Sequence, residues 1–241
     1  MRTLGLLGGM SWESTIPYYR RINERVRERL GGLHSARLLL YSVDFAQIEA
    51  LQHQGRWDEA GRVLADAALA LERAGAEALV ICTNTMHRVL PQIEAKLRMP
   101  VLHIADATAE RIHAAGFERV GLLGTRFTME QDFYRGRLEQ LGLTPLIPDA
   151  GQREIVHRVI YDELCQGECR AESRAAYREI IKGLVEAGAQ AVILGCTEIG
   201  LLVTAADSPV PLFDTASIHA EQAADWALAV SEIAQPQRRV V

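Results

Sequence analysis

Short runs of apolar residues alternate with longer amphipathic segments along the whole chain. The short runs are rich in Val, Ile and Leu, which is typical of strands buried in a parallel sheet. The longer segments, such as residues 56–76, repeat Ala and Leu every three or four positions and stop near a glycine, as amphipathic helices do. This alternation predicts an α/β fold in which mostly parallel sheets are flanked by helices. The predicted strands cover residues 3–8, 36–43, 78–83, 101–105, 119–124, 144–148, 191–196 and 211–214.

One sequence pattern occurs twice. Residues 74–87 read AGAEALVICTNTMH, and residues 187–200 read AGAQAVILGCTEIG. The two copies align without a gap at an offset of 113 residues, which places Cys196 opposite Thr83.

The repeat extends beyond this pair of segments. Two further pairs of similar segments are residues 4–11 with 120–127 and residues 99–106 with 208–214. We therefore expect two pseudo-symmetric halves, approximately residues 1–115 and 116–241, with a last helix able to cross back onto the first half.

Reactive or polar residues follow several predicted strands. In open α/β sheets, ligands bind beyond the carboxyl ends of the strands. Thr83 and Cys196 end one equivalent pair of strands, whereas Ser11 and Thr125 follow the glycines of another pair. If the halves face each other about a pseudo-twofold axis, Thr83 and Cys196 approach one ligand from opposite sides.

The composition of the chain argues against several classes of protein. The chain has 241 residues, a net charge of −5 and no basic stripe, which argues against a nucleic-acid partner. No apolar run approaches the ~20 residues of a membrane span, and the first apolar stretch is too short for a secretion signal. The four cysteines lack the spacing of a zinc site. We expect a cytoplasmic protein with reduced thiols, no metal and no membrane partner.

Cys196 is the strongest candidate for chemistry. A cysteine at a strand end is often only a small core residue. Here Gly195 permits close backbone approach, and Thr197 with Glu198 opens a predicted helix whose dipole would lower the thiol pKa. Cys82 lies one residue before Thr83, so it should point to the other face of its strand and be buried.

Other polar residues favour a ligand with a carboxylate. Asn84 and Thr85 can cap a helix, and the same helix start can hold an anion. The amides of Met10 and Ser11 could form a second anion site after the double glycine. The spacing of these glycines is not a dinucleotide fingerprint, so NAD is not expected. Gln52 could offer its amide to the same crevice.

The remaining candidates have simpler interpretations. Isolated histidines such as His87, His103 and His219 are more often packing or capping residues than catalysts. Cys165 and Cys169 are four residues apart, and without further metal ligands we interpret them as helix packing.

The segments GLLGGMSWEST, SVDF, CTNTMH, LLGTRFTM and GCTEIGLL resemble the aspartate/glutamate racemase family over nearly the whole chain. The resemblance implies two Rossmann-like halves, proton transfer at an amino-acid α-carbon without pyridoxal or any other cofactor, and commonly a homodimer. In the family pattern CNTxH, two cysteines flank the substrate. In this chain Thr83 occupies the position of the first cysteine, and Cys196 is the matched second one.

The resemblance implies a racemase for aspartate, glutamate or both, with Cys196 as base and Thr83 on the opposite face. The expected substrate contacts are Met10, Ser11, Gln52, Asn84, Thr85, Thr125, Thr197 and Glu198. Two alternatives stay open: a one-cysteine decarboxylase or isomerase of a dicarboxylate, and a non-catalytic amino-acid-binding protein.

Overall fold

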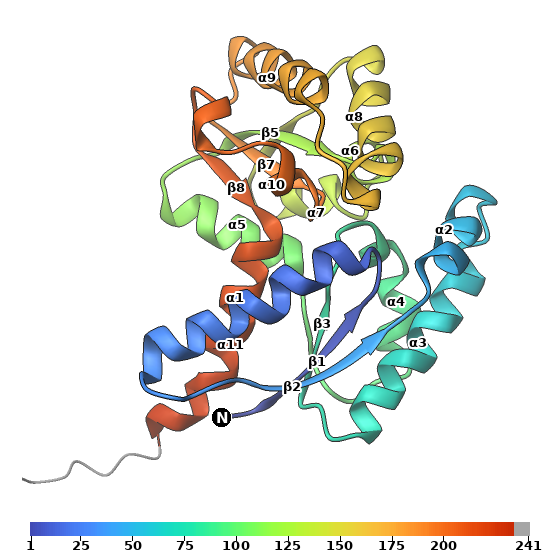
Figure 1. Ribbon diagram of the computed structural model, residues 1–241, viewed down its shortest axis with the longest axis vertical. Helices are drawn as coiled ribbons and strands as arrows, with labels where there is room; N and C mark the ends of the chain where they lie inside the picture. Colours follow the sequence, from blue (N-terminus) through green and yellow to red (C-terminus); the bar gives the residue numbers. More distant parts are fainter. Residues whose placement is uncertain (234–241) are drawn as a thin grey trace, which may run out of the picture.

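Two α/β halves form the molecule (Figure 1), and the computed structural model describes residues 1–233. Each half contains a four-stranded sheet, with strand order β2-β1-β3-β4 in the first and β6-β5-β7-β8 in the second. The strands of the first sheet are β1 (Thr3–Gly8), β2 (Arg37–Ser42), β3 (Ala78–Ile81) and β4 (Val101–Leu102). Those of the second are β5 (Arg119–Gly124), β6 (Thr144–Leu146), β7 (Ala191–Gly195) and β8 (Leu212–Asp214).

All neighbouring strands are parallel, and the two sheets have the same topology. The predicted α/β fold is therefore confirmed, and each predicted strand overlaps an observed one. β3 and β7 are equivalent in the two sheets, so their ends present Thr83 and Cys196 from corresponding positions.

Helices cover both sheets. The first half contains α1 (Trp12–Leu30), α2 (Phe45–His53), α3 (Trp57–Arg73), the 3₁₀ helix η1 (Thr85–Val89), α4 (Leu90–Glu94) and α5 (Ile104–Ala114). The second contains α6 (Arg126–Glu130), α7 (Arg135–Gln140), α8 (Ala150–Asp162), η2 (Leu164–Gln166), α9 (Ala171–Glu186), α10 (Ile199–Leu202), η3 (Ala205–Asp207) and α11 (Thr215–Ile233). None of the helices within residues 1–233 is long and apolar enough to cross a bilayer.

The inner strands β1 and β3 of the first sheet are buried on both faces, which explains their continuous apolar residues, whereas the edge strand β2 is largely exposed. Leu4 and Leu6 of β1 pack in a cluster with α1 and α11. Leu7, on the opposite face, packs in a second cluster with α2 and α3. Alternate side chains of one strand thus enter separate cores, as the twofold repeat of a strand requires.

The last helix of each half packs on the other half. Ile104 and Ile112 of α5 belong to the core around the second sheet. Ala220 and Ala224 of α11 belong to the cluster on the first sheet, beside α1. The two halves are therefore interlocked, and the domain boundary near residue 115 remains a proposal.

Candidate active site

Thr83 and Cys196 lie just beyond the ends of β3 and β7, and both are buried. Gly195, which precedes the cysteine, lies against the neighbouring strand β5. A Cβ at this position would be 2.8 Å from the Leu123 carbonyl oxygen, so the residue must be glycine for the strands to approach. This agrees with the role predicted for Gly195.

The Glu198 carboxylate is the centre of the hydrogen-bond network in the site. Its Oε1 accepts from the Ser11 backbone N–H at 3.3 Å and from the Ser11 hydroxyl at 2.9 Å. Its Oε2 accepts from the Cys196 thiol at 3.0 Å and from the Thr197 hydroxyl at 2.8 Å. One carboxylate therefore joins the first half, through Ser11, to the reactive thiol of the second.

The turn that presents Ser11 depends on glycine. Gly9 has a φ of +87°, and a Cβ there would overlap the backbone of Val43. The predicted anion site of this turn holds Glu198 of the chain itself. The Met10 side chain lies in the core with α2 and α3, so only its backbone belongs to the turn.

The electrostatics of Cys196 differ from the sequence-based expectation. Burial raises the pKa of its thiol well above the ordinary value, and the Glu198 carboxylate and Cys165 raise it further. The expected lowering by a helix dipole is wrong, because α10 has only four residues and begins three residues after the thiol. The thiol is therefore protonated at neutral pH and donates to Glu198.

Asn84 has one hydrogen-bonding atom left over. The Thr215 hydroxyl donates to the Leu194 carbonyl at 2.8 Å, so its oxygen can only accept from Asn84 Nδ2, 3.0 Å away. This fixes the orientation of the amide. Asn84 Oδ1 is buried and has no hydrogen-bond partner among the described residues. A ligand with an N–H group would satisfy it.

Two hydroxyl groups meet between the halves. Thr85 Oγ1 lies 3.0 Å from Thr125 Oγ1. Thr125 also caps α6, because its hydroxyl accepts from the Thr128 backbone N–H at 3.3 Å. Both threonines can donate a hydrogen bond to an anion placed between the halves.

Gln52 also lies between the halves. Its Nε2 is 2.8 Å from Met86 Sδ, and its Oε1 accepts from the Tyr161 hydroxyl at 3.0 Å. Tyr161, on α8, was not predicted as a site residue. Its helical pattern gives no sign that its hydroxyl crosses to the first half.

Cys165 is a second residue that the sequence did not reveal. It lies on η2 rather than on one helix with Cys169, and its thiol is 3.8 Å from Glu198 Oε1. Cys165 packs against the core around the second sheet, as the packing interpretation expects, but it also lies against the central carboxylate. Cys169 is exposed, so the packing interpretation is wrong for that residue.

Three buried histidines lie in a cluster beside the loop that carries Thr83. His87 Nδ1 donates to the Thr83 carbonyl at 2.9 Å, and Nε2 accepts from the Ile104 N–H at 3.5 Å. His103 caps α5, and His219 lies with His87 in the same cluster. Burial lowers the pKa of all three, so they are neutral at pH 7.

Cys82 is buried and packs among the side chains of α1 and α11, away from Thr83. Burial raises the pKa of its thiol. The prediction that Cys82 faces the opposite side of the strand is confirmed. Within the described residues, no group of three or more His, Cys, Asp or Glu side chains is placed to hold a metal.

Solved structures share this fold over almost the whole chain. A candidate Asp/Glu racemase from Yersinia pestis is 58% identical, with a TM-score of 0.88, and the alignment covers 95% of this chain and 100% of that one. An aspartate racemase homologue from Pyrococcus horikoshii is 36% identical, with a TM-score of 0.81, over 94% of this chain and 99% of that one.

Sequence comparison gives the same family. The broad specificity amino-acid racemase RacX of Bacillus subtilis is 23% identical over 232 residues, which cover 94% of this chain and 98% of RacX. The sequence pattern of the Asp/Glu/Hydantoin racemase family matches residues 7–223. Racemases are isomerases, so the expected enzyme class and the resemblance are both confirmed at the level of the family. The chain belongs to the Asp/Glu/Hydantoin racemase family.

Proposed function

We propose that the protein is a cofactor-independent amino-acid racemase in which Cys196 and Thr83 act on opposite faces of the substrate α-carbon. The observation that carries this proposal is the hydrogen bond from the buried Cys196 thiol to the Glu198 carboxylate. It joins a nucleophilic atom to a proton acceptor at the end of a central strand. The names of the Bacillus subtilis and Pyrococcus horikoshii relatives support an amino acid, with aspartate or glutamate as the first substrates to test.

The polar groups of the crevice suit the two charged groups shared by all α-amino acids. The unpartnered Asn84 Oδ1 would accept from the substrate ammonium group. The hydroxyls of Thr85 and Thr125 would donate to the α-carboxylate, where negative charge increases when the α-proton leaves. An ammonium-binding acceptor favours an amino acid over a dicarboxylate without an amine.

Glu198 would activate the thiol. Its Oε2 takes the Cys196 proton, and the thiolate then removes the α-proton, so a Cα–H bond breaks as an S–H bond forms. The proton stays on Glu198 until the thiol returns its own to the substrate or solvent. Since burial raises the Cys196 pKa, this transfer needs the positive charge of the bound ammonium group beside the thiolate.

Thr83 would return a proton on the other face. A hydroxyl is a weak acid, so Thr83 would pass its proton to the carbanion as it takes one from a water molecule, rather than remain as an alkoxide. The hydroxide left by that water would be neutralised by the proton that Cys196 gives up to solvent, after which Glu198 returns its proton to the thiolate. His87 would hold the loop for this step through its 2.9 Å hydrogen bond to the Thr83 carbonyl.

A second candidate function is amino-acid binding without turnover. The observation in its favour is the hydroxyl at position 83, where a thiol would be the stronger acid. We also propose that the enzyme works without pyridoxal and in the cytoplasm, where its four free cysteines would stay reduced.

Hydrogen exchange in deuterated water separates these functions. L-aspartate, L-glutamate and neutral L-amino acids are incubated with the protein, and α-deuterium and D-isomer are measured by NMR and chiral chromatography. A racemase gives both products, and Cys196→Ala abolishes both, whereas Cys82→Ala retains activity. Binding without deuterium entry would establish the second candidate. Equal losses in the two cysteine variants would contradict the assignment of the base.

A further inference from the structure

The residues that donate hydrogen bonds to the Glu198 carboxylate differ in their exposure to solvent. Ser11, Cys196 and Thr197 are buried, with exposed fractions of 2%, 8% and 6%. Cys165, whose thiol donates to Glu198 Oε1 over 3.8 Å, is partly exposed. Among the donors to this carboxylate within the described part of the chain, Cys165 is therefore the one that reaches solvent.

The turn that carries Cys165 lies at the surface. η2 is followed by Gly167, whose φ is +78°, and residues 166–170 are all exposed. A Cβ at Gly167 would be 3.0 Å from Glu13 Oε1, so the turn lies against the start of α1 in the first half. Glu13 also lines a hollow of about 340 Å³, which Leu201 of α10 borders on the other side. Solvent thus comes close to this turn.

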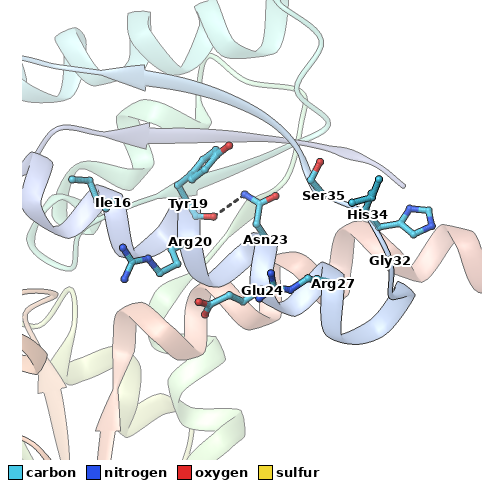
Figure 2. Close-up of a pocket in the computed structure, with 10 residues that line it drawn as sticks. Ile16, Tyr19, Arg20, Asn23, Glu24, Arg27, Gly32, His34 and Ser35 are labelled. Atoms are coloured by element: carbon cyan, nitrogen blue, oxygen red, sulfur yellow. Dashed lines mark hydrogen bonds between the residues drawn. The ribbon is translucent and has the colours of Figure 1, made fainter.

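A larger hollow offers no route out of the site. It has a volume of about 640 Å³ and lies between α1 and the loop that follows this helix (Figure 2). Tyr19, Asn23 and His34 are among the residues that line it, and none of the donors to Glu198 is. Water in this hollow is therefore not in contact with the buried carboxylate.

The proposed mechanism requires a proton to leave the buried site. Each turnover from the L-isomer to the D-isomer brings the α-proton to Cys196, so the Cys196–Glu198 pair then holds one proton more than before. A proton moves to a partner within hydrogen-bond reach, or to one that a single water bridges. The Cys196 thiol donates to Glu198 Oε2, so its proton passes first to that carboxyl group.

We propose that Cys165 relays protons between Glu198 and solvent, an inference that rests on the proposed racemase function. A proton enters the carboxyl group at Oε2 from Cys196 while another leaves Oε1 for the Cys165 sulfur, and the Cys165 S–H gives its own proton to water. One S–H bond of Cys165 forms as the other breaks, and Glu198 then returns its remaining proton to Cys196. Burial and the Glu198 charge raise the pKa of the Cys165 thiol, so it stays neutral between transfers.

Infrared spectroscopy of the full chain tests this relay without a substrate, because the S–H stretch shifts when a thiol takes up deuterium. The protein is transferred into deuterated water, and the Cys196 band is the one that Cys196→Ala lacks. In the wild type it should exchange faster than the band of Cys82, which is buried and donates to the Val80 carbonyl. Cys165→Val fills the space of the thiol without an exchangeable proton, and it should slow exchange at Cys196 roughly 100-fold.

Two further variants make the test specific. Cys169→Val is the matched control, since Cys169 lies in the exposed segment after η2 and donates to the Leu201 carbonyl, not to Glu198. It should leave exchange at Cys196 at the wild-type rate. Cys165→Ser should retain fast exchange, because a hydroxyl both donates and accepts a proton. Circular dichroism confirms that the variants fold.

Turnover gives a second measurement that a purely structural role of Cys165 would not change. L-aspartate and L-glutamate are each followed through a single turnover in deuterated water, with the enzyme in excess. In Cys165→Val, the ratio of deuterium in recovered L-substrate to D-isomer formed should fall about tenfold, because the proton on Cys196 returns to the substrate before it exchanges.

The proposal would be overturned by a Cys165→Val protein in which Cys196 exchanges as fast as in the wild type. Equal slowing in Cys169→Val, exchange in Cys165→Ser as slow as in Cys165→Val, or a wild-type Cys196 that exchanges no faster than Cys82 would overturn it as well. A wild type that forms no D-isomer and takes up no deuterium would overturn the proposed function instead. The thiol exchange rates would still decide whether Cys165 connects Glu198 to solvent.

Discussion

Glu198 has a buried carboxylate that accepts hydrogen bonds from both halves and from the Cys196 thiol. In Glu198→Gln the side chain keeps its size, but it can no longer take the thiol proton. We expect kcat for racemisation to fall by about 10²–10³-fold, the usual contribution of a positioned proton acceptor. The pKa of Cys196 should fall at the same time, because a charge that raises it is removed.

The lower pKa would favour the reactive thiolate, whereas the loss of the proton acceptor lowers kcat, so the two quantities are measured separately. Racemisation gives kcat, and the pH dependence of Cys196 alkylation, followed by peptide mass spectrometry, gives the thiol pKa. Glu163→Gln is the control, since Glu163 is another buried glutamate of the second half and receives its hydrogen bond from Ser173. A Glu198→Gln enzyme with wild-type kcat would show that Glu198 only holds the turn.

Loss of the Thr83 hydroxyl should slow racemisation but not deuterium exchange into the L-substrate. In the family that the chain resembles, the cysteine of the second half serves the L-isomer, and we propose the same role for Cys196. Thr83→Ala should therefore still admit deuterium into L-substrate. Formation of the D-isomer should fall by roughly 100-fold, since no group returns a proton on the other face. Thr83→Cys should bring the two rates closer together by supplying a second thiol.

Both rates come from one time course in deuterated water. Faster exchange of the D-isomer than of the L-isomer in the wild type, or an unchanged ratio in Thr83→Cys, would contradict this division of roles. Neither residue changes the final mixture, because the enantiomers have equal free energy in water.

The sequence locates those site residues that follow strands and misses those that cross between halves. Thr83 and Cys196 could be predicted because the repeat aligns two strand ends, a local property of the chain. Tyr161 reaches Gln52 from 109 residues away, and no local pattern encodes that contact. The direction of the Cys196 pKa shift cannot be predicted for the same reason, since its burial and the electrostatic influence of Glu198 and Cys165 arise only in the tertiary structure.

At the scale of elements, the inner strands β1, β3, β5 and β7 were predictable because both faces are covered and nearly all of their residues are apolar or glycine. The predicted ends of the strands were less accurate than their existence. β3 stops at Ile81, before the predicted end at Thr83, because Cys82 and Thr83 leave the sheet for the turn into η1. The sequence analysis allows the last helix, α11, to cross onto the first half, but the crossing of α5 onto the second was beyond the pattern, since an Ala-rich amphipathic helix fits either core.

Three neutral histidines join η1, α5 and α11, and their burial should make the protein sensitive to acid. The folded-state pKa values of His103 and His219 are lowered to about 3 and about 4, and that of His87 also lies well below 6.5. In the unfolded chain all three gain protons below about pH 6.5, whereas the folded state resists protonation. The free energy of unfolding should therefore fall by about 1.4 kcal/mol per pH unit for each histidine as the pH drops from about 6 towards 4.

Urea unfolding across this pH range measures the slope. His103→Asn is the informative variant, because asparagine can still cap α5 and accept from the Ala105 N–H, as His103 does at 3.1 Å. It should remove about one third of the histidine contribution to the slope. His34→Asn, in the exposed loop after α1, should leave the slope unchanged. Equal slopes in all three proteins would mean that the buried histidines do not govern the acid response.

At the scale of the whole molecule, the crevice is closed although a substrate must enter it. Thr83 and Cys196 are 7% and 8% exposed. On one side of the molecule, α1, α11 and α5 are joined by ion pairs such as Arg21 with Glu221 and Arg111 with Glu221. This interlocked side, where the halves exchange helices, is suited to act as the hinge.

The other side is closed by a small set of contacts between halves. The ring of Trp57 meets that of Phe127 edge-on, with centroids 5.0 Å apart. Arg88 lies over Trp57 at 3.9 Å and donates to Gln131 at 2.6 Å. Because these contacts are few and lie away from the interlocked helices, we expect the crevice to open here.

Trp57→Ala should therefore expose the site without disturbing its chemistry. The rate of Cys196 alkylation by iodoacetamide, followed by peptide mass spectrometry at fixed pH, should rise about tenfold as the closed state loses roughly 1.4 kcal/mol of aromatic contact with Phe127 of the other half. Trp226→Ala is the matched control, because Arg2 lies over Trp226 at 4.3 Å in the same manner, but both residues belong to the interlocked side. Bound substrate should protect Cys196 in the wild type more than in Trp57→Ala, since closure over the ligand depends on the missing ring. If Trp226→Ala exposes the thiol as much as Trp57→Ala does, access to the site reflects general loosening of the fold, and the aromatic contact between the halves is not the gate.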